Sequence, residues 1–307
     1  MERYRNCMLC PRMCGVDRTA GSLGACRSGA LPRVAHTMLH MWEEPCISGK
    51  NGSGIIFFSG CPLGCVYCQN HKISRSYVGA EYDAEALSEL FLSLESRGAH
   101  NINLVTATQY IPHLCAAIPR AREKGFSLPI VYNTSGYERR ESLALLAGFV
   151  DIFLTDVRYH NASTAKKYSF ASDYPHVAIS ALEEMLRLVG DPLLDGDGML
   201  LRGVIVRLLL LPGHLIEAKQ ILKEVYTRFG DHVYISLMSQ YTPVGDIAEK
   251  APELDRRVTP YEYASLVAYA QSLGVRMAFT QSGEAAEESF IPDFLGEMGK
   301  TSLQKEK

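Results

Sequence analysis

Residues 59–70 read Ser-Gly-Cys-Pro-Leu-Gly-Cys-Val-Tyr-Cys-Gln-Asn and place Cys61, Cys65 and Cys68 at C-x3-C-x2-C spacing. Three thiolates this close along the chain can face one inorganic centre if the loop curls around it. Gly60 and Gly64 allow that curl, because glycine tolerates positive φ. Structural zinc sites and ordinary iron–sulfur clusters take four protein ligands. A 4Fe–4S cubane held by three cysteines leaves one iron open for chemistry, so the spacing predicts a catalytic cluster.

The same three cysteines have two other interpretations, a zinc knuckle and free thiols in a reducing cytosol. A zinc knuckle needs a fourth ligand nearby. The next imidazole along the chain, His71, follows the third cysteine too closely to serve well. The sequence therefore favours the cluster, with Cys61, Cys65 and Cys68 as its ligands.

Length and composition indicate a globular protein with one large domain and a small appendage. The chain has 307 residues, is 47% hydrophobic and 21% charged, and carries a net charge of -3. This balance gives no general electrostatic reason for binding nucleic acid or an anionic membrane. No apolar run reaches the length of a membrane span, and the first residues lack the apolar core of a signal peptide. We expect a cytoplasmic protein, in an anaerobic or microaerobic setting that protects a reduced cluster.

A second group of cysteines lies near the N-terminus at C-x2-C-x3-C-x11-C spacing. Its members are Cys7, Cys10, Cys14 and Cys26. Four thiols in a segment without hydrophobic periodicity predict a small lobe, residues 1–40, that is held by zinc or by a second iron–sulfur cluster. The alternative is free cysteines in a loosely folded leader. Several arginines accompany them, and we interpret these as an offset to thiolate charge rather than as a nucleic-acid surface, because no aromatic stacking pattern accompanies them.

Strand-like and helix-like stretches alternate after residue 32. We expect strands at 33–41, 54–58, 102–106, 129–133, 150–155, 203–211, 232–238 and 275–280. We expect helices at 80–97, 111–124, 139–147, 162–168, 174–189, 215–229 and 260–273. Repeated strand–helix units predict an α/β fold with a parallel sheet, curved into a partial (β/α)6-type TIM barrel. This domain would span residues 41–295, followed by a flexible tail at 296–307.

Polar residues follow the apolar core of successive strands. They include Thr106, Thr108, Asn133, Asp156 and Arg207. Parallel α/β folds place their active sites at the carboxyl ends of the strands. Asparagine and aspartate are also common in ordinary loops, so one such residue alone is weak evidence for a binding site. The whole set indicates a binding site on that edge.

With these motifs the chain resembles the radical S-adenosylmethionine (radical SAM) superfamily, whose signature is the three-cysteine spacing with an aromatic residue, here Tyr67, before the last cysteine. It most resembles a subgroup related to pyruvate formate-lyase activating enzymes that carries an N-terminal C-x2-C-P-R-x-C segment. The resemblance covers about residues 42–241 and includes Glu43-Glu44-Pro45, Asn133-Thr134-Ser135-Gly136-Tyr137 and Gln240-Tyr241-Thr242-Pro243.

The resemblance implies a radical SAM core, a 4Fe–4S cluster and bound S-adenosylmethionine, which an electron from the cluster cleaves to methionine and a 5′-deoxyadenosyl radical. Flavodoxin or ferredoxin would supply the electron. Tyr67 would pack the adenine, and Thr106 and Thr108 would lie near the methionyl amino group. Asn133 and Asp156 would lie further round the ring of strand ends. Arg207 would lie near the ribose or carboxylate, and Arg158 could clamp a carboxylate.

Three functions remain open at this point. The radical removes a hydrogen atom from a glycine of a glycyl radical enzyme, or it acts on another protein, a peptide or a small molecule. Alternatively, the protein is a non-catalytic iron–sulfur or zinc protein for electron transfer or scaffolding. In either enzyme the N-terminal lobe could recognise a partner, in which case removing residues 1–30 would spare cofactor cleavage.

Overall fold

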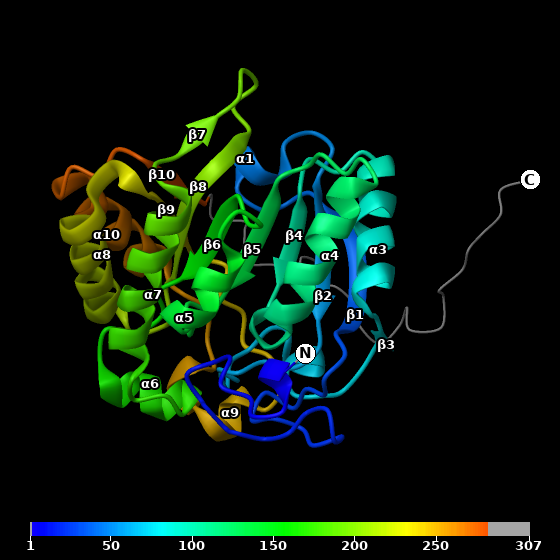
Figure 1. Ribbon diagram of the computed structural model, residues 1–307. Coiled ribbons are helices and arrows are strands. Elements are labelled where there is room, and N and C mark those ends of the chain that lie inside the picture. Colours follow the sequence, from blue (N-terminus) through cyan, green and yellow to red (C-terminus); the bar gives the residue numbers. More distant parts are fainter. Residues whose placement is uncertain (1, 282–307) are drawn as a thin grey trace, which may run out of the picture.

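The computed structural model describes residues 2–281. Residues 282–295 of the predicted catalytic domain and the predicted tail at 296–307 lie outside the described residues. Strands and helices alternate along most of the described chain. Two helices, α3 (Ala84–Ser96) and α4 (Ile111–Glu123), lie near one end of a large sheet, and α8 (Leu215–Phe229) and α10 (Pro260–Ser272) lie near its other end (Figure 1). Within this part of the chain, no helix has both the length and the apolar character needed to cross a membrane.

The sheet is mostly parallel and has the strand order β10-β9-β8-β6-β5-β4-β2-β1-β3. Neighbours from β2 to β10 are parallel, with Asp156 opposite Arg207 as one example of their register. These strands are β2 (Ser53–Phe58), β4 (Ile102–Val105), β5 (Ile130–Thr134), β6 (Ile152–Asp156), β8 (Leu200–Leu209), β9 (Tyr234–Met238) and β10 (Ala278–Thr280). The predicted α/β class and parallel pairing are confirmed.

Three further strands join the sheet through antiparallel pairs. β1 (Arg33–His40) pairs antiparallel with β2, and β3 (Ala80–Glu81) pairs antiparallel with β1. The two-residue strand β7 (Leu193–Leu194) pairs antiparallel with the start of β8. Residues 33–40, which the sequence grouped with the N-terminal lobe, therefore form a strand of the main sheet.

The long helices bury one apolar face against the sheet. They are α3 (Ala84–Ser96), α4 (Ile111–Glu123), α7 (Tyr174–Val189), α8 (Leu215–Phe229) and α10 (Pro260–Ser272). Side chains of the cap residues fix two of their starts, because they accept hydrogen bonds from otherwise unpaired backbone N–H groups. Asp83 accepts from the backbone of Ala86 at 2.8 Å, and Thr259 and Glu262 form a capping box. Pro260 occupies the first turn of α10, where its missing N–H costs no hydrogen bond.

Short elements account for most differences from the expected boundaries. The predicted helix at 139–147 divides into α5 (Arg140–Leu143) and a 3-10 turn, Ala144–Leu146. The 162–168 helix is α6 (Ala162–Ser169). The sequence missed α1 (Pro45–Ser48), α2 (His71–Ser74) and α9 (Ile247–Lys250). A four-residue helix completes about one turn, so it leaves no hydrophobic periodicity to read.

The N-terminal segment (residues 2–32) contains one 3-10 turn, Glu2–Tyr4, and otherwise turns and bends. It lies across the end of the sheet where α6 and α9 are found (Figure 1). The hydroxyl of Tyr4 is 2.8 Å from Nδ1 of His113 in α4, and the carbonyl of Cys26 accepts from the amide of Cys61 at 3.1 Å. The segment is therefore attached both to a helix and to the loop that follows β2.

Candidate functional site

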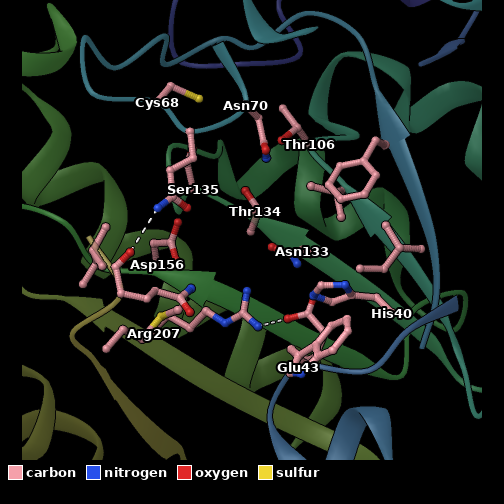
Figure 2. Close-up of a pocket in the computed structure, with 18 of the residues that line it drawn as sticks. His40, Glu43, Cys68, Asn70, Thr106, Asn133, Thr134, Ser135, Asp156 and Arg207 are labelled. Atoms are coloured by element: carbon pink, nitrogen blue, oxygen red, sulfur yellow. Dashed lines mark hydrogen bonds and ion pairs between the residues drawn. The ribbon is translucent and has the colours of Figure 1, made fainter. Parts of the chain in front are cut away.

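A cavity of about 720 Å³ extends from the loop after β2 to residues between β1 and α1. Figure 2 shows Cys68 and Asn70 at one end, Thr134, Ser135 and Asp156 along the walls, and a far end formed by His40, Glu43 and Arg207. Its volume is typical of sites for small molecules and cofactors. The walls come from the carboxyl ends of β4, β5 and β6, as the sequence predicted.

The cysteine loop (residues 59–70) brings its three sulfurs to one end of this cavity. Cys61, Cys65 and Cys68 all line it. The loop curls at Gly60 and Gly64, whose φ angles are 84° and 67°. A Cβ atom on Gly60 would lie 2.5 Å from the carbonyl oxygen of Cys26, so this position accepts no side chain. The predicted curl and its glycine requirement are both present.

Hydrogen-bond donors surround the sulfurs. The Ser169 hydroxyl donates to Sγ of Cys65 at 3.0 Å, and Nη1 of Arg158 lies 3.8 Å from the same sulfur. The Ser74 hydroxyl donates to Sγ of Cys68 at 3.5 Å. Such donors stabilise a thiolate more than a thiol. Burial, together with the neighbouring cysteines, raises the pKa of Cys61 to about 12, so without a cation the thiol stays protonated.

Tyr67 belongs to a buried network at the same end of the cavity. Its hydroxyl is 2.8 Å from that of Tyr159, which in turn is 2.6 Å from the hydroxyl of Ser169. The ring of Tyr67 meets those of Tyr168 and Tyr241 edge-on. The network thus connects the aromatic residue of the motif with the serine that donates to Cys65. Tyr67 lines the cavity, where it was expected to pack a purine.

Most of the predicted strand-end residues meet at the walls. Thr106, Asn133, Asp156 and Arg207 line the cavity. Thr106 has a φ of 60°, which is unusual for a β-branched residue and is typical of functional sites. Asp156 forms an ion pair with Arg158, so the arginine that was expected to clamp a ligand carboxylate already contacts a protein carboxylate.

Thr108 is placed differently. It is buried and absent from the cavity lining, and its hydroxyl donates to Glu138 at 2.6 Å. Thr134 and Tyr132 also donate to this carboxyl group. Burial raises the pKa of Glu138 to about 7. Thr108 therefore supports a buried carboxyl group behind the wall, a role that the sequence did not indicate.

Arg207 is held at the far end by two carboxylates. Its Nε donates to Oε1 of Glu44 at 2.8 Å and its Nη2 donates to Oε2 of Glu44 at 2.7 Å, and Nη2 also pairs with Glu43. Burial raises the pKa of Glu44, and it lowers that of Arg207. A guanidinium group remains charged in proteins, so one cation is shared by two carboxyl groups. In this arrangement the fork of Arg207 faces protein carboxylates rather than an open ligand position.

A comparison with protein families identifies this architecture. The model of the radical SAM superfamily matches residues 55–225, more than half of the chain. The chain belongs to the radical SAM superfamily. Membership implies a 4Fe–4S cluster and S-adenosylmethionine as cofactors. The matched range begins in β2, immediately before the cysteine loop.

Two relatives extend this result. An uncharacterized protein of Methanocaldococcus jannaschii is 25% identical over 283 residues, which cover 90% of this chain and 77% of that protein. The crystal structure of a radical SAM methyltransferase from Sphaerobacter thermophilus has a TM-score of 0.54 at 15% sequence identity, covering 76% of this chain and 69% of that one. At this identity the likeness concerns the radical SAM fold alone.

The donor set of the cysteine loop fits such a cluster. Among residues 2–281, no three histidine, cysteine, aspartate or glutamate side chains are arranged to hold a single metal ion. A cubane binds each of its three thiolates at a different iron, so the sulfurs need not converge on one point. The arrangement thus speaks against a zinc knuckle in the loop. His71 instead places Nδ1 3.2 Å from the carbonyl oxygen of Cys68.

The N-terminal cysteines lie outside the cavity. Cys7, Cys10 and Cys26 are buried, and Cys14 is half-buried. The sulfurs of Cys14 and Cys26 each lie 3.4 Å from the position that a Cβ atom on Gly24 would take. None of the four forms a disulfide bond.

Several site residues carry no local sequence signal. Ser169 is 104 positions from the cysteine to which it donates, and Glu44 is 163 positions from Arg207. Glu138 follows the quoted Asn133–Tyr137 stretch directly, yet a glutamate there reads as an ordinary loop residue. Glu43 and Glu44 were noted only as part of a resemblance. Their role depends on the fold bringing them to β8.

Proposed function

We propose that this radical SAM protein is an activating enzyme, which removes a hydrogen atom from a glycine of a glycyl radical enzyme. The observation that carries the proposal is the single cavity, with three cysteines at one end and a ring of polar strand ends along its walls. A non-catalytic iron–sulfur protein has no use for that ring. The glycine substrate rests on the resemblance of the cysteine loop and the N-terminal C-x2-C-P-R-x-C segment to activating enzymes.

Each group of residues has a distinct role in this proposal. Cys61, Cys65 and Cys68 hold the cluster, and Tyr67 packs the adenine. Thr106, Asn133 and Asp156 contact the remaining polar groups of S-adenosylmethionine. Thr108, which lies behind the wall, and Arg207, which faces two carboxylates, act by holding the wall in place.

When bound, the cluster and S-adenosylmethionine supply a 5′-deoxyadenosyl radical. The residues of this chain then orient the cofactor and keep water from the reacting atoms. Arg158 contacts both the cavity wall and the cysteine loop, because it pairs with Asp156 and places a donor 3.8 Å from the sulfur of Cys65. It thereby fixes the wall of the cavity relative to one cluster ligand.

Beyond the cavity, the proposed enzyme has a curved sheet, a second metal centre, an electron donor and a partner protein. The sheet curves as a partial (β/α)6-type barrel, so that the strand ends face one cavity. A second iron–sulfur cluster, rather than the zinc ion that the sequence left open, occupies Cys7, Cys10, Cys14 and Cys26, because no three histidine, cysteine, aspartate or glutamate side chains of residues 2–281 are arranged to hold a single metal ion. Flavodoxin or ferredoxin delivers the electron, and the protein that supplies the glycine docks at the mouth of the cavity.

The first experiment measures cofactor cleavage without any partner. The full chain is reconstituted anaerobically and reduced with dithionite in the presence of S-adenosylmethionine. We expect 5′-deoxyadenosine, and we expect its loss in Cys65→Ala. The control is Cys115→Ala, which removes a cysteine of α4 that does not line the cavity. A reconstituted cluster without cleavage would contradict the proposal.

The second experiment tests the substrate. A glycyl radical enzyme is added to the reduced protein and examined by electron paramagnetic resonance. We expect a carbon-centred radical on the added enzyme that is absent when its glycine is replaced by alanine. Cleavage of S-adenosylmethionine without radical transfer to any glycyl radical enzyme would favour another protein, a peptide or a small molecule as the substrate.

A further inference from the structure

One arginine of the N-terminal segment is buried without a carboxylate. Arg18 is 1% exposed, and no aspartate or glutamate of the described residues is among the partners of its guanidinium group. Its donors go to the carbonyl oxygen of Gln109 at 2.6 Å and to that of Gly29 at 2.9 Å. Neutral carbonyls satisfy the hydrogen bonds of a guanidinium group but leave its charge unbalanced.

The groups that could balance this charge are thiols. Nη1 of Arg18 lies 3.8 Å from Sγ of Cys7. The remaining contacts of the guanidinium group are the faces of Tyr4 and Tyr110, 4.5 and 5.5 Å from the ring centroids. Aromatic faces stabilise a cation only in part. A thiolate would supply the missing negative charge, and thiolates persist in a buried segment when a metal binds them.

We propose that Cys7, Cys10, Cys14 and Cys26 bind an iron–sulfur cluster as thiolates, each at a different iron, that Arg18 is its buried counter-charge, and that this centre braces the cysteine loop. The inference rests on the second metal proposed above and assigns it a structural role. Two of these sulfurs lie close together beside Gly24, since a Cβ atom there would lie 3.4 Å from those of both Cys14 and Cys26.

The brace consists of direct contacts between the two cysteine segments. The carbonyl of Cys26, one of the four ligands, accepts from the amide of Cys61 at 3.1 Å. Arg12, between Cys10 and Cys14, donates to the carbonyl oxygens of Pro62 at 3.0 Å and Leu63 at 3.2 Å. These carbonyls belong to the cysteine loop between its first two ligands.

Arg12 also reaches the element behind the loop. Its Nη2 donates to the carbonyl oxygen of Ser169 at 2.9 Å, and its Nη1 donates to that of Phe170 at 2.6 Å. Ser169 is the residue whose hydroxyl donates to Cys65. A single side chain of the N-terminal segment therefore sets the cysteine loop and the end of α6 relative to each other, which makes Arg12 a positioning residue.

The metal itself is tested in a chain that cannot form the catalytic cluster. The variant Cys61→Ala/Cys65→Ala/Cys68→Ala is purified without oxygen and analysed for iron, sulfide and zinc. We expect it to retain the iron and sulfide of about one cluster per chain. Adding Cys10→Ser or, at the half-buried position, Cys14→Ser should remove this iron and sulfide, and adding Cys115→Ser should not. A triple variant that holds no iron and sulfide, or that holds zinc alone, would overturn the centre.

The brace is tested with Arg12→Ala in the otherwise unchanged chain. We expect hydrogen exchange of the amides in residues 61–66 to become roughly fivefold to tenfold faster, because several hydrogen bonds are lost, and we expect less iron in the catalytic cluster. Arg12→Lys should restore part of the protection. Arg5→Ala, an exposed arginine of the same segment, is the matched control. Unchanged exchange and iron content in Arg12→Ala would overturn the brace.

These readouts do not depend on cleavage of S-adenosylmethionine. Failure of the proposed function would appear as a wild-type protein with both centres and no 5′-deoxyadenosine. Failure of this inference would appear as a cleaving enzyme whose N-terminal segment holds no metal, or whose cysteine loop is unaffected by Arg12→Ala.

Discussion

Two arginines are buried in contrasting surroundings. Arg207, at the far end of the cavity, pairs with the carboxylates of both Glu43 and Glu44. Arg18, in the N-terminal segment, contacts carbonyl oxygens, one thiol and two aromatic rings. The first site has more carboxylates than cations, whereas the second has a cation and no carboxylate among the described residues. Carboxylates balance the charge of Arg207, whereas the acidic side chains of the described residues do not balance that of Arg18.

This difference separates two kinds of buried charge. A carboxyl group can take up a proton when its charge is not compensated, but a guanidinium group cannot release one at ordinary pH. An excess of carboxylates, as around Arg207, is therefore relieved by protonation. An excess of cation, as at Arg18, requires an anion. The predictions below test each side of this distinction.

The largest effect is expected for Arg207→Met. It leaves two buried carboxyl groups without their cation, so the free energy of unfolding should fall by about 3 to 5 kcal/mol, as measured by urea denaturation at neutral pH. Arg202→Met, which removes an exposed arginine from the same strand, should change it little. Adding Glu43→Gln and Glu44→Gln to Arg207→Met should restore most of the loss. If the triple variant were no more stable than Arg207→Met, the ion pairs would not be the cause.

A smaller effect is expected at Glu138, a buried carboxyl group held by hydroxyl groups. Burial raises its pKa to about 7 from an ordinary value of 4.5, so the folded protein binds this proton more tightly than the unfolded chain. The group therefore favours folding at low pH, and its contribution is lost as the pH rises from 4.5 through about 7. The total change is roughly 3 kcal/mol, since one pKa unit corresponds to about 1.4 kcal/mol.

Replacing Glu138 by glutamine should remove this dependence. Urea unfolding at about pH 5 and about pH 8 should show a smaller loss of stability for Glu138→Gln than for the wild type. The exposed Glu141→Gln is the control. An equal pH dependence in the wild type and Glu138→Gln would mean that the carboxyl group is already ionised at low pH, and that its hydroxyl partners outweigh burial.

The smallest effect, at Arg18, decides the comparison. In the metal-loaded protein, Arg18→Met should weaken metal retention by the N-terminal cysteines roughly 10- to 100-fold, the usual cost of removing an outer partner of a metal ligand. Competition with a chelator measures this change. In a chain whose four N-terminal cysteines are serines, the same substitution should leave stability unchanged or increase it, because an uncompensated charge is removed. Equal retention of metal with and without Arg18 would show that its charge is balanced elsewhere.

The sequence predicted most of the fold because the signals are local. The helix Leu215–Phe229 has the predicted boundaries, and the expected strands in the parallel sheet agree to within a few residues. Apolar spacing and terminal glycines mark such elements along the chain. The antiparallel direction of β1 was not predicted, because the residue pattern of a single strand does not show whether it pairs parallel or antiparallel with its neighbour.

The site was predictable only where residues follow each other closely. Cys61, Cys65 and Cys68 span eight positions, so a curl of the loop keeps their side chains at the same end of the cavity. Thr108 appeared to belong with Thr106, but the backbone turns between them and directs Thr108 to Glu138. The sequence could not show this turn, because it depends on the positive φ of Thr106.

By itself, the sequence determined the cysteine motif, the radical SAM superfamily and the order of strands and helices, because motifs and periodicity are local features of the chain. Only the tertiary structure decided which distant groups share a charge or a hydrogen bond. The pairing of Arg207 with Glu44, the donation from Ser169 to Cys65 and the contact of Arg12 with the cysteine loop are of this kind. Each of these contacts joins segments that are far apart in the sequence and meet only when the sheet and its helices pack. No spacing pattern in the sequence reveals such a contact.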